Sequence, residues 1–181
     1  MTFTNVSKIL LHIFAWIIFV GLCIEASAFI ISTLATLFMN PEAASRFYRI
    51  VDLSPVYNSD ETSFVTLTVL MIIVAVLKAI LFFLIIKILY NKQFTLSHPF
   101  NEQVRRFVLS SAFLALGIGF FASWAAGFRE SLLTKNITVP PLDALRVGGA
   151  DVWVFMGVIL LVIAQVFKKG IAIQQENDLT V

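Results

Sequence analysis

The sequence predicts an all-α integral membrane protein: a four-helix transmembrane bundle with a short amphipathic helix in the first external loop. Of its 181 residues, 59% are apolar and only 13% are charged, whereas a soluble domain has about 25% charged residues. The mean hydropathy is +0.93, and the apolar residues gather in four long segments. This composition excludes a disordered chain, a disulfide scaffold and a nucleic-acid-binding domain, so we expect no direct contact with nucleic acid.

Four membrane spans are expected along the chain, at about 9–39, 64–90, 107–128 and 147–167. A helix needs roughly 20 residues to cross a hydrocarbon core of about 30 Å, and each segment has about that length. The alternation of polar and apolar residues that marks a membrane β-strand is absent from the sequence of these segments. Because no second domain or internal repeat is visible, residues 1–181 are expected to form a single transmembrane domain.

The first span could also be interpreted as a secretory signal peptide. Lys8 precedes its apolar run, and Ala26-Ser27-Ala28 is similar to a small-residue cleavage site. The apolar run resumes directly afterwards at Phe29, however, and Glu25 is unusual beside such a site. The segment is also longer than the apolar core of a signal peptide, so a retained helix is the preferred prediction.

The first external loop opens with Asn40-Pro41-Glu42, which combines an N-cap residue, a proline at the first helical position and an acid in the first turn. Apolar side chains then recur at helical spacing, at Ala44, Phe47, Tyr48 and Val51. A short amphipathic helix is therefore expected, as a structured lid over the bundle rather than a ligand site. Residues 52–63 contain Pro, Asn, Ser and Asp and are expected to form an irregular connection.

The basic residues predict the orientation of the spans. With the N-terminus inside, seven lie on the cytoplasmic side and five on the other. The seven are Lys8, Lys87, Lys92, Arg105, Arg106, Lys168 and Lys169. Since cytoplasmic loops carry an excess of Lys and Arg, we expect both termini, the loop 91–106 and the tail 168–181 to be cytoplasmic.

Glu25 and Lys78 are the two charged residues that cannot be placed in a loop, a tail or an interface. With a rise of 1.5 Å per residue, their depths in spans one and two differ by only about 3 Å, so the two side chains can pair. An intramembrane charge needs a partner or water. The pair is interpreted either as a salt bridge that fixes helix packing or as part of an ion or ligand pathway. Transporters usually have more intramembrane polar groups and broken helices, which favours the salt bridge.

The third span carries small residues at every fourth position, namely Ser111, Ala115, Gly119, Ser123 and Gly127. Such a stripe allows another helix to approach closely, within the monomer or in a homo-oligomer. The sequence contains no metal-ligand spacing, phosphate-binding glycine loop or nucleophile elbow. We therefore expect no metal, no cofactor and no enzyme activity.

Three segments resemble a known family. The chain ends in Glu176-Asn177-Asp178-Leu179-Thr180-Val181, and Asn91-Lys92-Gln93-Phe94 and Asn101–Arg106 lie in the loop before the third span. These segments resemble a bacterial family of small four-helix membrane proteins known as domain of unknown function 2975. The resemblance runs from about the second span to the C-terminus, and it does not extend to the loop 40–63.

The resemblance implies a multi-pass protein of the bacterial inner (plasma) membrane that has no established activity. Members of the family are often neighbours of a small helix-turn-helix regulator of the Cro/repressor type. This implies a partner that contacts the loop 91–106 and the tail, with contacts at Glu176, Asn177, Asp178, Leu179 and Thr180. Alternatively, the tail is a helix extension that packs under the bundle through Ile171, Ile173 and Leu179.

Two functions are therefore expected. The first is a non-enzymatic interaction or regulatory role through the cytoplasmic loop and tail, in contact with membrane lipid. The second is a small transporter or an ion or ligand pathway that uses Glu25 and Lys78.

Overall fold

The computed structural model describes residues 3–48, 51–90 and 101–178, and their side chains over 9–48, 51–90 and 101–176. Within these residues the chain forms six helical segments and no strand. Four of the helices are long and apolar enough to cross a membrane. The predicted fold class, an all-α four-helix membrane protein, is confirmed.

The four long helices are α1 (Phe3–Phe38), α3 (Glu61–Tyr90), α4 (Glu102–Thr134) and α5 (Ala150–Asp178). The two short ones are the 3-10 helix η1 (Pro41–Arg46) and α2 (Ser54–Ser59). Each long helix covers one predicted span. The largest difference is in α5, which begins three residues after the expected start at 147 and continues eleven residues beyond the expected end at 167.

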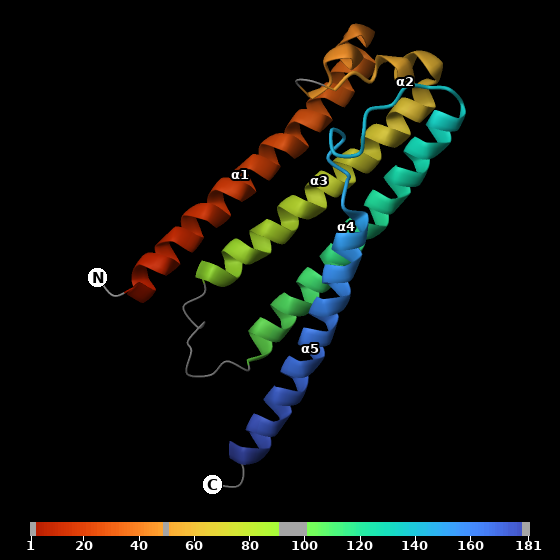
Figure 1. Cartoon of the computed structure of the whole chain (residues 1–181). Helices are drawn as coiled ribbons and strands as arrows, with labels where there is room; N and C mark the ends of the chain where they lie inside the picture. The colour runs from red at the N-terminus through yellow and green to blue at the C-terminus, as the bar shows by residue number, and fades with distance from the viewer. Residues whose placement is uncertain (1–2, 49–50, 91–100, 179–181) are drawn as a thin grey trace.

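The long helices pack in chain order. Helix α3 lies between α1 and α4, and α4 makes its most extensive contact with α5 (Figure 1). The start of α1 and the end of α5 lie at one end of the bundle, which we call the open end. Helices η1 and α2 lie at the other end, and from there the connection between α4 and α5 runs back along the bundle to the start of α5, beside the middle of α4 (Figure 1). We call residues 39–48, 51–60 and 135–149 the cap.

Side-chain caps fix where the helices begin. The Asn40 side chain accepts a hydrogen bond from the Glu42 backbone N–H at 2.9 Å, at the start of η1. The Asn101 side chain accepts one from the Val104 N–H at 2.8 Å, at the start of α4. Asp60 caps α3 in the same way. Each bond satisfies an N–H group that has no partner within its own helix.

The short helix expected in the loop after α1 is present as η1 and begins after Asn40 as predicted, but it is a 3-10 helix that ends at Arg46, and Tyr48 then takes a left-handed backbone with φ 42°. One expectation for this loop was wrong: the segment 52–63, expected to be irregular, contains α2. The physical reason is a tight reversal, in which the Leu53 N–H donates to the Ala44 carbonyl at 2.9 Å.

The periodic apolar residues of this loop are nevertheless buried. Ala44 and Phe47 are both 0% exposed, and they belong to the main core together with Phe29 of α1 and Phe64 of α3. The Phe47 ring lies 6.0 Å from each of those two phenylalanine rings. The cap is therefore a hydrophobic lid, anchored by aromatic contacts to two membrane helices.

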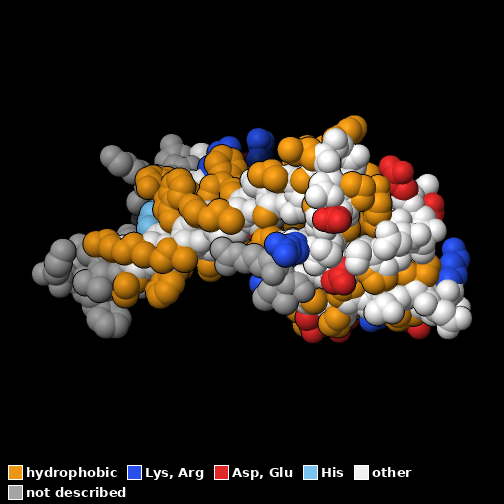
Figure 2. All heavy atoms as spheres, turned by 90° about the horizontal axis from the view of Figure 1, so that it is seen from above, with side chains coloured by type: hydrophobic (Ala, Val, Ile, Leu, Met, Phe, Trp, Pro, Cys, Tyr) orange, Lys and Arg blue, Asp and Glu red, His pale blue; other side chains and the backbone are white. Residues whose placement is uncertain are grey.

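The core is unevenly distributed along the bundle. The main hydrophobic cluster joins the cap to the parts of α1, α3 and α4 that lie nearest to it. A second, small cluster toward the open end contains Val104, Val108 and Ala164. Many large apolar side chains of α1 and α5 are exposed, as expected of helices that face lipid. In Figure 2, hydrophobic side chains cover much of the face in view, and the acidic side chains lie in its right half.

Candidate functional site

The two intramembrane charges both contact one residue of the cap. Arg146, in the connection between α4 and α5, places its Nε 3.7 Å from Glu25 Oε2 on α1. Lys78 on α3 donates a hydrogen bond from its Nζ to the Arg146 backbone carbonyl at 2.9 Å. Among the described residues, the ion pair of Glu25 is with Arg146, and no ion pair joins Glu25 directly to Lys78. Arg146 therefore bridges the two side chains that the sequence singled out.

The environments of the two acid–base partners differ. The Glu25 side chain is 13% exposed, whereas that of Arg146 is 57% exposed. Because the Glu25 carboxylate has little contact with solvent, its charge needs a cation nearby. The more exposed Arg146 guanidinium is that cation. Among the described residues, this guanidinium donates no hydrogen bond, because its contact with Glu25 at 3.7 Å is an ion pair only.

Lys78 also contacts the last membrane helix. Its Nζ lies 5.9 Å from the centre of the Trp153 ring on α5, within the range of a cation–π interaction. We call Glu25, Lys78, Arg146 and Trp153 the Arg146 cluster. It joins α1, α3, α5 and the cap through polar contacts, in a region where polar groups have few other partners.

The backbone around Arg146 is held in an unusual conformation. Arg146 has φ 60°, which is left-handed and costs roughly 1 kcal/mol or more for a residue with a Cβ. Its neighbours Leu145 and Val147 are buried, at 0% and 1% exposed, and anchor the turn on both sides. Gly149, further along the same turn, has φ 75°, a conformation that favours glycine. Packing on both sides therefore maintains the strained residue.

A pocket of about 770 Å³ opens in the cap and reaches Arg146. It is lined by Tyr48, Val51, Asp52, Pro55, Thr138, Val139, Pro140, Pro141, Asp143, Ala144 and Arg146. Its volume is within the range of small-molecule sites, about 300–1,000 Å³. Two of its lining residues, Tyr48 and Arg146, have a left-handed backbone. Such strain is found at ligand clamps and switch regions, which makes this cap pocket a candidate binding site.

Arg129 of α4 fixes one wall of the cap pocket. Its Nε donates to the Pro140 carbonyl at 2.6 Å and its Nη2 donates to the Val139 carbonyl at 3.3 Å. Asp52, which also lines the pocket, accepts a hydrogen bond from the Ser54 N–H at 2.9 Å. Two cations thus connect the pocket to the membrane helices: Arg129 holds it to α4, and Arg146 contacts α1 and α3.

The small residues of α4 separate into two groups. Ser111, Ala115 and Gly119 are buried, whereas Ser123 and Gly127 are exposed. A Cβ on Gly119 would lie 2.6 Å from Val154 Cγ2 and 3.0 Å from the Val154 backbone N. The first group therefore packs α4 closely against α5. The Ser111 Oγ is buried and has no hydrogen-bond partner among the described residues.

The predicted tail contacts lie at the limit of the described chain. Helix α5 includes Glu176, Asn177 and Asp178, although only Glu176 has a described side chain. Leu179, Thr180 and the loop 91–100 lie outside the described residues. Of the residues expected to pack the tail under the bundle, Ile173 is 60% exposed and does not do so. Among the described residues, no group of three His, Cys, Asp or Glu side chains could hold a metal ion.

The fold and the Arg146 cluster together define a four-span membrane protein whose membrane helices are joined to a folded cap. The chain belongs to the family described as protein of unknown function (DUF2975), whose model matches residues 39–181. No curated protein and no solved structure matches the chain. The family match confirms the resemblance, and it also includes the loop 40–63, to which the resemblance did not extend. Glu25 precedes the matched region, whereas Lys78, Arg146 and Trp153 lie within it.

Sequence reasoning identified Glu25 and Lys78 but missed Arg146, Trp153 and the cap pocket. Arg146 is one of the five basic residues counted on the non-cytoplasmic side, and that count gives none of them a further role. A usable signal was its position between apolar residues, in Leu145-Arg146-Val147, directly before Gly148-Gly149. This context indicates that the backbone at Arg146 is anchored, although it does not give the direction of the side chain.

Proposed function

We propose that the chain is a non-enzymatic protein of the bacterial inner membrane, with an interaction or regulatory role through its open end. The surface involved is the loop 91–106 and the tail 168–181. Seven basic residues on this side against five on the other support a cytoplasmic position for it and for both termini. A small helix-turn-helix regulator is the partner that the family resemblance suggests.

The observation that carries this proposal is the length of α5. Its 29 residues extend about 44 Å, whereas a hydrocarbon core is about 30 Å thick. The helix continues past Lys168 and Lys169, which suit the level of the lipid headgroups, as far as Asp178. Ile173, in this extension, is 60% exposed. A helix that projects from the membrane with an exposed apolar residue suits a protein partner.

The test is site-specific photo-crosslinking in cells, with a photoreactive residue at position 173 or 162. Val162 and Ile173 are both on α5 and both 60% exposed, but only Val162 lies in the membrane-spanning part. We expect a protein crosslink at 173 that is absent at 162. The absence of a crosslinked protein at 173, or the same product at both positions, would contradict the proposal.

The alternative is a small transporter or an ion or ligand pathway through Glu25 and Lys78. The specific observation in its favour is that the cap pocket is lined by Arg146, which contacts both residues. Flux in liposomes should then fall in Glu25→Gln and Lys78→Met variants. Unchanged flux in both variants would eliminate this alternative, and the crosslink at 173 separates it from the first proposal.

A further inference from the structure

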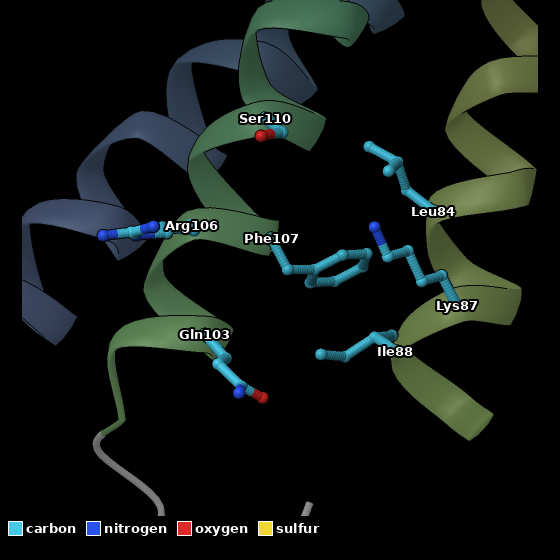
Figure 3. Close-up of a pocket in the computed structure, with 7 residues that line it drawn as sticks. All are labelled: Leu84, Lys87, Ile88, Gln103, Arg106, Phe107 and Ser110. Atoms are coloured by element: carbon cyan, nitrogen blue, oxygen red, sulfur yellow. The ribbon is translucent and has the colours of Figure 1, made fainter. Parts of the chain in front are cut away.

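A second pocket lies between α3 and α4 at the open end, far along both helices from the cap. Its volume is about 340 Å³. The residues that line it are Leu84, Lys87, Ile88, Gln103, Arg106, Phe107 and Ser110 (Figure 3). The first three belong to α3 and the other four to α4, so the pocket is formed by the seam between two membrane helices.

The lining combines apolar walls with cations. In Figure 3, Leu84 and Ile88 of α3 face the Phe107 ring of α4, and the Lys87 side chain extends between the two helices. Among the described residues, the Lys87 ammonium forms no ion pair or hydrogen bond. A cation beside apolar side chains at a membrane surface favours an anion as its partner.

A second cation lies at the rim. Arg106 Nε is 3.1 Å from Glu102 Oε1, and the Arg106 side chain is 75% exposed. The same carboxylate accepts a shorter bond, 2.6 Å, from Arg105 Nη2. An exposed ion pair of this kind contributes only about 0–1 kcal/mol, so Arg106 can turn to another anion at little cost. The lining of the pocket thus has two cations, Lys87 and Arg106, and no carboxylate.

The pocket lies at the depth of lipid headgroups. Lys87 is three residues before the end of α3 at Tyr90, and Arg106 is four residues after the start of α4 at Glu102. At 1.5 Å per residue, both are within about 6 Å of a helix end. The 30 residues of α3 span about 45 Å, so roughly 7 Å at each end extends beyond a 30 Å hydrocarbon core.

We propose that this pocket binds the headgroup of an anionic phospholipid. The phosphate lies against Lys87 with Arg106 at the rim, and the glycerol oxygens meet the polar side chains of Gln103 and Ser110. One acyl chain follows the apolar wall of Leu84, Ile88 and Phe107 toward the membrane interior. Basic pockets between transmembrane helices bind anionic headgroups in this way. The excess of cations selects an anionic lipid over a zwitterionic one.

The test is native mass spectrometry of the full-length protein in detergent, titrated separately with phosphatidylglycerol and phosphatidylethanolamine. The variants are Lys87→Gln and, as a matched control, Lys135→Gln, which removes an exposed lysine at the cap end of α4. We expect wild type and Lys135→Gln to prefer phosphatidylglycerol. Lys87→Gln should bind it about fivefold more weakly, with its binding of phosphatidylethanolamine unchanged.

Two further experiments refine the test. The first distinguishes a lipid ligand from a soluble phosphate, and the second tests whether binding needs the open space of the pocket as well as its cations. Millimolar glycerol 3-phosphate should not displace phosphatidylglycerol, because it lacks the acyl chains. Ser110→Leu, which keeps both cations but fills the pocket, should weaken the binding of phosphatidylglycerol. Equal affinity for this lipid in wild type and Lys87→Gln would overturn the proposal. Displacement by glycerol 3-phosphate would also overturn it, by indicating a site for soluble anions.

Discussion

The two ends of the bundle differ in how their helices are joined. At the cap, Phe47, Leu53 and Leu145 are 0% exposed and fill the space between the membrane helices. At the open end, the packed cluster is small, and the pocket of about 340 Å³ separates α3 from α4. The difference shows that the helices are held together mainly at the cap. Both binding surfaces proposed above lie at the open end.

Arg146 joins the cap to the membrane helices. Its backbone is part of the cap, and it contacts Glu25 on α1 and Lys78 on α3. A ligand in the cap pocket would meet the same guanidinium that neutralises Glu25. Because an intramembrane carboxylate without a partner is costly, occupancy of the pocket would bias how α1 and α3 sit against the cap.

The largest expected effect tests the cap as the stable end. Phe47→Ala removes a ring that packs against Phe29 and Phe64, and we expect it to lower the free energy of unfolding by about 3 kcal/mol or more. Phe113→Ala is the control, because Phe113 is 61% exposed on α4 and should change stability little. Reversible unfolding of both variants in mixed micelles measures the difference, and equal losses would show that the cap is not a core.

The next effect tests the seam between α4 and α5. Gly119→Ala places a Cβ within 3.1 Å of the Ala150 carbonyl oxygen and closer still to Val154, so the helices must separate. We expect a loss of about 1–3 kcal/mol in the same assay. Gly127→Ala is matched to it, because nothing lies within 4 Å of that Cβ, and it should be neutral or slightly stabilising. Similar losses for both would contradict the close approach at Gly119.

The smallest effect concerns the start of α3. The Asp60 carboxylate accepts hydrogen bonds from the Ser63 hydroxyl at 2.8 Å and the Ser63 N–H at 2.9 Å. The hydroxyl bond first, then the backbone bonds of Ser63 and Thr62, hold the pKa of Asp60 below its ordinary value. Because this pKa is lowered, the ionised Asp60 carboxylate stabilises the fold at pH values above the unfolded-state pKa. That stabilisation is lost as the pH falls through the folded-state pKa.

Thermal unfolding of wild type and Asp60→Ala across pH 7 to pH 2.5 checks this sign. The melting temperature of wild type should exceed that of the variant at neutral pH, and the gap should close in acid. A gap that is constant with pH would mean that the ionised carboxylate is not the stabilising form.

The spans could be predicted because their signal is simple. A run of about 20 apolar residues has few alternatives to a transmembrane helix, since lipid offers no partners for unpaired backbone groups. The burial of Ala44 and Phe47 followed from their spacing in the same way. The helix expected there forms only as the short η1, because the chain reverses at Tyr48, which takes a left-handed backbone that spacing alone does not reveal.

The site was predicted only in part, for a related reason. Intramembrane charges are conspicuous in an apolar run, so Glu25 and Lys78 stood out. Their bridge comes from a loop more than 60 residues further along the chain, and a loop arginine has no periodic pattern that gives its direction. The sequence left open whether the tail continues the last helix, because the polar residues after Phe167 end the span without ending the helix.

The central claim is that Arg146 connects the cap to the intramembrane charges. A double-mutant cycle measures this most directly, with Glu25→Gln, Arg146→Gln and Lys78→Gln singly and in pairs, by unfolding in mixed micelles. We predict that the Glu25–Arg146 coupling energy is the larger of the two that involve Glu25, at about 0.5–1 kcal/mol for a partly exposed pair. A Glu25–Arg146 coupling of zero beside a substantial Glu25–Lys78 coupling would contradict the account.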